Sequence, residues 1–479
     1  MAYSNSIIEQ QPLYTQLPVG QEVIFVVSNV SLVSTQTKVK FAAEVRISDT
    51  TPPNPNNTTH LIGTFKTTPN NAGVGMFDFR NIIENYVSAD NLASQGSSYK
   101  GTVVTQEDPR PLHLVDKYSL SNNSTRYMVI RFYAEYLGAD VTRPTVVSRA
   151  DGTDADTGLF TLFNGYLKYS DVLTMGAGTT ASNFGYSLST FNLSSNTDKF
   201  LTNAPTLQTC NINDYGTLSF LAPNDNLDLF TLTYYDSNGD TLGTEDIDRT
   251  EANGAYDIFT SDVENQIIHF GCFPGNLQNW SITFKALVTL GTIEGGSIRL
   301  QAKTNDASVP GYPRISAAYT ININCPGLKG YESIRLCWLN QWGVWDYYTF
   351  TLRSTRNLTT QGTTYQQLEG SWNSSTYRLD SYKGGKKAFR VNATERISMN
   401  TDYVSEDFNT MFEELINSPE VYMLSEYQDT TETFSALNQY VTPVRLTTSN
   451  FTRKTIANDK LIQYTFEIEK SKTLRTQAV

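Results

Sequence analysis

The chain has 479 residues, of which 39% are hydrophobic and 18% charged, and its formal net charge is -12. The length favours about three domains over a single core, and 28 Tyr with 24 Phe argue against a disordered chain. Residues 1–330 hold 20 Lys or Arg against 31 Asp or Glu, so we expect no nucleic-acid partner, because duplex binding rests on cationic contacts to phosphate.

The N-terminal residues and the cysteines indicate where the chain is made. No basic region followed by an apolar core opens the sequence, and no apolar run approaches the roughly 20 residues of a membrane span. The four cysteines, Cys210, Cys272, Cys325 and Cys337, are widely spaced in apolar or strand-like segments. We therefore expect buried free thiols, no membrane span, and assembly in a reducing cytoplasm.

Residues 1–150 are predicted to form a β domain with one helix. An alternating pattern predicts a hairpin from Glu22–Ser28 and Lys38–Ile47. Arg126–Leu137 is apolar on both faces and should be a central strand. The remaining elements expected here are a strand over Leu61–Thr67 and a helix within 77–92.

Residues 151–325 are predicted to form an antiparallel β-sandwich. The clearest hairpin of the chain begins with the apolar strand Leu227–Tyr235 and turns at Asp236–Gly239, where Asn-Gly stands between apolar runs. Further strands are expected at Trp280–Leu290 and Ser297–Lys303.

Residues 326–479 are predicted to form an α+β module. A helix is expected over 405–417, opened by acidic residues and followed by Pro419. The strands expected in this module are Ser333–Leu339, Trp345–Leu352, Val421–Leu424, Val441–Thr447 and Leu461–Ile468. The whole chain is thus expected to be mainly β, with three antiparallel β-sandwich-like modules and a few short helices.

The sequence offers little that resembles a catalytic or metal site. His60, His113 and His269 have no metal-ligand neighbour at helical spacing, and each is expected to be a surface or strand residue. A Ser-His-Asp arrangement or a pair of carboxylates cleaving polysaccharide is not excluded, since sequence does not show such distances.

Two further segments carry weak signals for ligands. Lys383–Arg390 is glycine-rich without the phosphate-binding frame and is expected to be a solvated loop. The acids from Asp236 to Asp248 do not follow the order of a calcium loop. We predict no enzyme activity, no metal and no cofactor.

A dense aromatic segment, residues 331–350, predicts a hairpin with a tight turn at Asn340–Gly343. Trp338, Trp342, Trp345 and Tyr347 are expected to fill the core of the third module. The alternative is a subunit interface through Trp342, Trp338 and Tyr347, with Trp342 at the turn tip, because Trp and Tyr are enriched at such contacts.

This hairpin resembles one found in virion structural proteins of tailed bacteriophages, associated with tail, baseplate or fibre, in phages of marine bacteria and Bacteroidetes. The segments 63–78, 270–277 and 415–422 resemble those proteins as well, in the same order. The resemblance implies a structural virion subunit that assembles with copies of itself, as a trimer or ring, and with other virion proteins. The alternatives are a capsid-decorating or head-fibre protein, and a module that binds a receptor or host-surface glycan.

Overall fold

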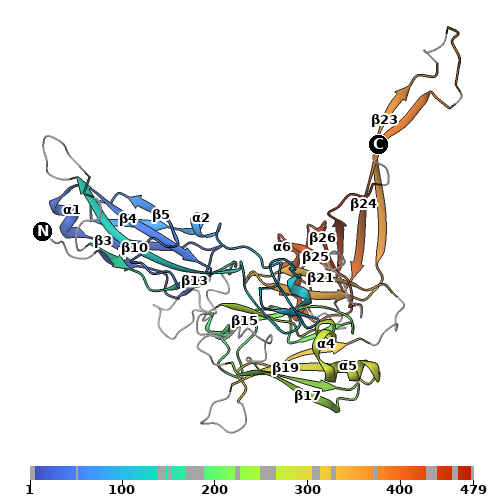
Figure 1. The fold of residues 1–479 in the computed structure, drawn as a ribbon, viewed down its shortest axis with the longest axis horizontal. Coiled ribbons are helices and arrows are strands. Elements are labelled where there is room, and N and C mark those ends of the chain that lie inside the picture. The colour runs from blue at the N-terminus through green and yellow to red at the C-terminus, as the bar shows by residue number, and fades with distance from the viewer. Residues whose placement is uncertain are drawn as a thin grey trace. The chain divides into compact units, whose positions relative to one another are not determined.

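The computed structural model describes residues 6–49, 52–137, 146–147, 153–168, 188–221, 227–248, 266–304, 313–324, 331–370, 375–380, 382–427, 440–455 and 462–475. The predicted mainly β fold, with several antiparallel sheets and short helices, is confirmed (Figure 1). The chain divides into two compact units. Unit 1 comprises Met1–Pro326, Leu339–Asp346 and Glu426–Leu437, and unit 2 comprises Gly327–Trp338, Tyr347–Ser425 and Asn438–Val479.

Unit 1 begins with two sheets that share one core. The smaller sheet has the order β1 (Ile7–Gln10), β3 (Ile24–Ser28), β6 (Val74–Asp78). The larger sheet contains β2 (Gln16–Pro18), β13 (Phe160–Phe163), β10 (Thr125–Leu137), β4 (Thr37–Ser48) and β5 (Leu61–Thr67), with β11 (Val146–Val147) and β12 (Ala155–Asp156) beside β10. Phe25 of the smaller sheet contacts Phe132 and Phe160 of the larger one, with ring centres 5.7 and 5.6 Å apart. Because β10 lies between β4 and β13, the prediction of a central strand is confirmed.

A second pair of sheets completes unit 1. The larger has the order β14 (Leu207–Cys210), β20 (Tyr319–Ile323), β19 (Ser297–Lys303), β16 (Leu229–Tyr235), β17 (Thr241–Asp248). The smaller has the order β15 (Leu218–Leu221), β18 (Ile267–Phe270), β9 (Tyr118–Leu120). The rings of Phe230 and Phe270 stack between them at 4.8 Å. The predicted hairpin around Asp236–Gly239 is confirmed as β16 and β17.

Unit 2 is built on one antiparallel sheet with the order β22 (Trp345–Phe350), β21 (Ile334–Leu339), β25 (Val421–Leu424), β26 (Val441–Leu446), β27 (Thr465–Lys470), β24 (Gly385–Asn400), β23 (Thr355–Gln367). The helix α6 (Asn409–Asn417) follows the short turn η6 (Glu406–Phe408), as predicted for 405–417. Its Phe412 packs on Phe466 at 5.4 Å and on Tyr348 at 5.0 Å. One face of this sheet is therefore covered by α6.

The remaining described elements are short. They are α1 (Val30–Thr35), α2 (Arg80–Ile83), β7 (Ser98–Tyr99), β8 (Thr102–Val103), η1 (Leu112–Leu114), η2 (Ser189–Phe191), α4 (Pro274–Trp280) and α5 (Ile282–Thr289). Among the helices in the described part of the chain, none has both the length and the apolar character needed to cross a membrane.

The strand predicted at Trp280–Leu290 is wrong, because this segment forms the end of α4 and the whole of α5. Pro274 stands at the start of α4, where the missing N–H of proline costs nothing. The side chain of Ser281 accepts a hydrogen bond from the backbone N–H of Phe284 at 2.9 Å and caps α5. These local signals start two helices in a segment that is predicted as a strand from its sandwich-like spacing.

The hairpin predicted from residues 21–50 is also wrong, although both of its strands exist. Asn29 caps α1 by accepting a hydrogen bond from the backbone N–H of Leu32 at 3.1 Å, and the helix redirects the chain. As a result β3 pairs with β1 and β6, while β4 pairs with β10 and β5.

The helix predicted within 77–92 is reduced to the four residues of α2. Phe77 and Asp78 belong to β6, which pairs with β3. After α2 the backbone N–H of Ser88 donates to the carbonyl of Asn123 at 3.0 Å, so the chain leaves the helix early.

The division into segments 1–150, 151–325 and 326–479 stays a prediction. Unit 1 runs through residue 150, and strands pair across that point: β13 joins the sheet of β10, and β9 joins the sheet of β18. Of the four cysteines, Cys210, Cys272 and Cys337 are buried free thiols, as predicted, and Cys325 lies outside the described residues.

Candidate functional site

The turn of the aromatic hairpin is fixed by Asn340 and Gly343. The backbone N–H of Asn340 donates to the carbonyl of Val344 at 2.8 Å, and that of Gly343 donates to Asn340 at 3.0 Å. Gly343 has a φ of +71°, and a Cβ at this position would lie 1.6 Å from the carbonyl oxygen of Asn164. Only glycine fits this turn, as its sequence position predicts.

The three candidate interface residues lie in the interior. Trp342, Trp338 and Tyr347 are 1%, 0% and 2% exposed. The ring of Trp342 contacts Phe191 at 4.9 Å, and the guanidinium of Arg335 lies 5.2 Å from the ring of Tyr347. These side chains leave almost no accessible surface to offer a partner, so a contact surface has to be sought elsewhere on the chain.

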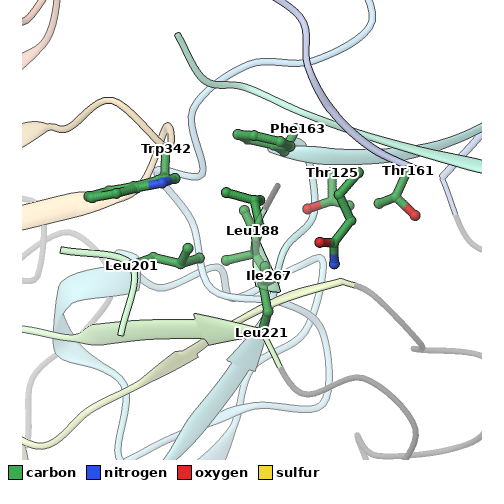
Figure 2. Close-up of a pocket in the computed structure, with 9 residues that line it drawn as sticks. Thr125, Thr161, Phe163, Leu188, Leu201, Leu221, Ile267 and Trp342 are labelled. Atoms are coloured by element: carbon green, nitrogen blue, oxygen red, sulfur yellow. The ribbon is translucent and has the colours of Figure 1, made fainter. Parts of the chain in front are cut away.

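Trp342 lines an apolar cavity in unit 1. Figure 2 shows the side chains around it: Gln16, Thr125, Thr161, Phe163, Leu188, Leu201, Leu221, Ile267 and Trp342. The free space is about 10 Å³, which is close to the minimum for one water molecule. The cavity is a packing gap, too small to hold a ligand.

A second, more open hollow lies elsewhere in unit 1. Its free space is about 240 Å³, below the roughly 300 Å³ at which small-molecule pockets begin. Lys199 is the one charged side chain in its lining, whose other members are Phe191, Phe200, Thr202, Asn203, Ala204, Pro205, Thr206, Ala317, Ala318 and Tyr319. A single exposed lysine beside small apolar residues does not define a catalytic constellation.

One Ser-His-Asp arrangement is present in unit 1. Ser219 on β15 faces His269 on β18, with 2.8 Å between Oγ and Nδ1. The Nε2 atom of His269 lies 3.4 Å from Oδ2 of Asp90. All three residues are at most 2% exposed, and neither cavity described above is lined by any of them. The serine has the partners of a nucleophile without access for a substrate.

Asp90 is the centre of this buried network. Its carboxylate accepts hydrogen bonds from Ser124 and from the backbone N–H groups of Asn122 and Asn123, and its carbonyl accepts one from Nε1 of Trp345 at 2.7 Å. Burial raises the pKa of Asp90, but the bonds from His269, Ser124 and Asn123 together hold it below its usual value. Such a satisfied network fixes the position of neighbouring strands.

No group of three or more potential metal ligands occurs in the part of the chain that the structure describes. The carboxylate of Asp236 accepts hydrogen bonds from the backbone N–H groups of Asn238 and Asp240 at 2.9 and 2.8 Å. This acid is thus occupied in stabilising the β16–β17 turn.

The most distinctive surface is a two-stranded ribbon, residues 355–394, which we call the arm. It comprises β23, the outer part of β24 and the residues that connect them. The two strands pair over thirteen positions from Thr355↔Ser398 to Gln367↔Gly385 (Figure 1). β24 pairs with β27 only from Arg396 to Asn400. The solvated loop predicted at Lys383–Arg390 is therefore wrong for most of its length, because β24 begins at Gly385.

The arm exposes apolar side chains. Eight of the 22 large hydrophobic residues exposed in the described regions belong to it: Leu358, Tyr365, Leu368, Tyr377, Leu379, Tyr382, Phe389 and Val391. Nothing in the sequence analysis pointed to this surface. The usable signal was the Thr- and Gln-rich run at 355–367, which lacks the alternation of a half-buried strand.

Comparisons with known proteins add little. No protein-family model matches the chain, and a search of curated proteins gives no match. Among solved structures, the native conformation of alpha-2-macroglobulin from E. coli aligns with 83% of this chain and 22% of its own, at 8% identity and a TM-score of 0.18. The chain thus spans about a fifth of that protein, and a likeness this low carries no argument.

Proposed function

We propose that this chain is a structural subunit of a tailed-bacteriophage particle, in the tail, baseplate or fibre attachment, and that it acts by self-assembly and contacts with other virion proteins. The observation that carries the assembly role is the arm. A ribbon of two strands is marginally stable alone in water, and its apolar side chains are exposed, so it needs a partner surface.

The virion location rests on the resemblance of the aromatic hairpin and three further segments to phage structural proteins. The Ser219-His269-Asp90 network does not favour a catalytic alternative, since its serine is 2% exposed. A capsid-decorating or head-fibre position is the alternative within this class.

The test is the composition of virus particles. Particles are purified from a lysate of the infected host, and their proteins are identified and counted by mass spectrometry. We expect the chain at several copies per particle. Its presence in the lysate together with its absence from purified particles would contradict the proposal.

Binding of a host-surface glycan is a second candidate function, favoured by the exposed tyrosines of the arm. Tyr365, Tyr377 and Tyr382 are 43%, 57% and 73% exposed, and tyrosine rings stack on sugar rings. A glycan array with the intact protein, and with Tyr365→Ala/Tyr382→Ala as control, tests it. Signal that is equal for both proteins would exclude these rings as the binding surface.

A further inference from the structure

The outer edge of β24 is open along the arm. From Gly385 to Asn392 this strand pairs only with β23 within the described residues. At Ala393 its outer edge meets Leu474, with mutual backbone hydrogen bonds of 2.9 and 2.8 Å. Over these eight residues, about every second one points its N–H and C=O away from β23, and these groups have no strand partner in the part of the chain that the structure describes. Such an edge is the template for addition of another strand.

The charges along this edge select a partner. The arm carries six Lys or Arg residues and two acids, out of 36 and 48 in the chain, which leaves 30 bases against 46 acids elsewhere. The open edge itself holds Lys386, Lys387 and Arg390 and no acid. Lysines on an edge suppress pairing with like strands, and the same charges favour an acidic one.

A matching acidic edge exists in unit 1. β17 is the last strand of its sheet in the described part of the chain, and it is eight residues long. The hairpin that ends with it, residues 227–248, contains six acids and no base. Asp240, Asp246 and Asp248 are exposed along it.

We propose that the open edge of β24 in one molecule adds as a strand to β17 in a second copy of this chain. This inference rests on the proposed function, which is self-assembly, and it identifies the two strands through which copies of the chain make contact. The edge of β24, eight residues long, then pairs with the eight-residue strand β17, and opposite charges face each other across the new ladder. Because the two surfaces are different, the contact is head-to-tail, and its repetition produces a closed ring or a filament.

The experiment uses reciprocal charge reversal in the full-length chain, with mass followed by sedimentation at several salt concentrations. The arm variant is Lys386→Glu/Lys387→Glu, and the edge variant is Asp246→Lys/Asp248→Lys. Each alone should weaken self-association by about tenfold or more, and an equimolar mixture of the two should restore it. The wild type should dissociate as salt rises.

The matched control is Lys199→Glu/Lys472→Glu, which makes the same charge change on exposed lysines outside the arm. It should associate as the wild type does, and circular dichroism should show the wild-type strand content in all variants. Association of both reversed variants at wild-type strength overturns the proposed contact, as does failure of the mixture to recover. A wild type that stays monomeric also overturns it, whereas the virion location is decided separately by particle composition.

Discussion

Trp342 has a side chain of a type that is common at subunit interfaces, but it belongs to a hydrophobic core. The sequence placed it at a turn tip, and the structure buries it among residues of unit 1, including Phe163 and Leu188 (Figure 2). Trp342→Ala should lower the free energy of unfolding by about 3–5 kcal/mol, because it removes a large buried aromatic side chain. Chemical denaturation of the purified chain measures this. A contact role would instead leave the unfolding free energy within about 0.5 kcal/mol of the wild type and weaken association.

Asp346 makes stability depend on pH near neutrality. It is buried beside Thr202, whose hydroxyl donates to its Oδ1 at 2.5 Å, while Oδ2 makes no hydrogen bond within the described residues. Burial raises the pKa of Asp346 to about 7. The folded chain therefore holds a proton that the unfolded chain has released, so the contribution of Asp346 to stability is greatest below about pH 4 and declines as pH rises toward 7.

Asp346→Asn removes this titration with almost no change in shape. The wild type should lose up to about 1.4 kcal/mol per pH unit relative to the variant between pH 5 and 7. Denaturant unfolding of both proteins at three pH values measures the difference. Parallel pH curves for the two proteins would contradict the assignment.

Ser219 is expected to be inert. A serine-reactive phosphonate should leave it unmodified in the native protein, because its hydroxyl is buried between two strands. Ser219→Ala should cost about 1–3 kcal/mol, since Nδ1 of His269 then loses its partner in a buried site. Labelling of Ser219 in the native protein, found by peptide mass spectrometry, would contradict this expectation and support a catalytic role for the serine.

At the scale of elements, local signals predicted strands better than pairings. Leu61–Thr67 and Val421–Leu424 have the predicted bounds, because alternation and flanking turn residues define them within the segment. The residues of β3 do not themselves show which strands it pairs with, because its partners β1 and β6 lie in other segments of the chain. α5 was missed because a strand was predicted there from the spacing of a β-sandwich, and its cap, Ser281, is a single local signal.

Only part of the candidate site could be predicted from the sequence. The turn at Asn340–Gly343 was predictable from its residues, whereas the burial of Trp342 depends on β13 and on residues 188–201, which are distant in sequence. The arm was not predicted because its two strands give different signals: Phe389 and Val391 of β24 alternate like residues of a strand with one buried face, whereas β23 lacks such alternation. Only the whole sheet shows that no further strand or helix covers them in the described residues.

Shortening the arm should leave the rest of unit 2 folded. Thr360 and Ala393 are paired, so residues 361–392 can be replaced by the pair Asn-Gly, which favours a tight hairpin turn. We expect the melting temperature to stay within a few degrees of the wild type, because most of the excised residues that the structure describes are exposed. Mass in solution should fall. An early loss of structure would mean that the arm belongs to the core of unit 2.

At the scale of the whole molecule, the division into two compact units predicts two unfolding transitions. Phe132 lies in the first core of unit 1, and Phe412 in that of unit 2. Scanning calorimetry should show that Phe132→Ala lowers one transition and Phe412→Ala the other. A single transition that both substitutions lower equally would indicate one cooperative molecule.

The arm and unit 1 also differ in the sequence separation of their paired strands, which bears on the order in which they fold. β23 and β24 are neighbours in sequence, whereas β2 pairs in parallel with β13 across more than 140 residues. Contacts between distant segments form slowly, while a hairpin closes within about 1–10 μs. The four large sheets of unit 1 lie between Ile7 and Ile323, so they can form as the chain leaves the ribosome, before residue 355 is made. The arm is made later than β17, so the acidic edge proposed to receive it can already be folded when the arm leaves the ribosome.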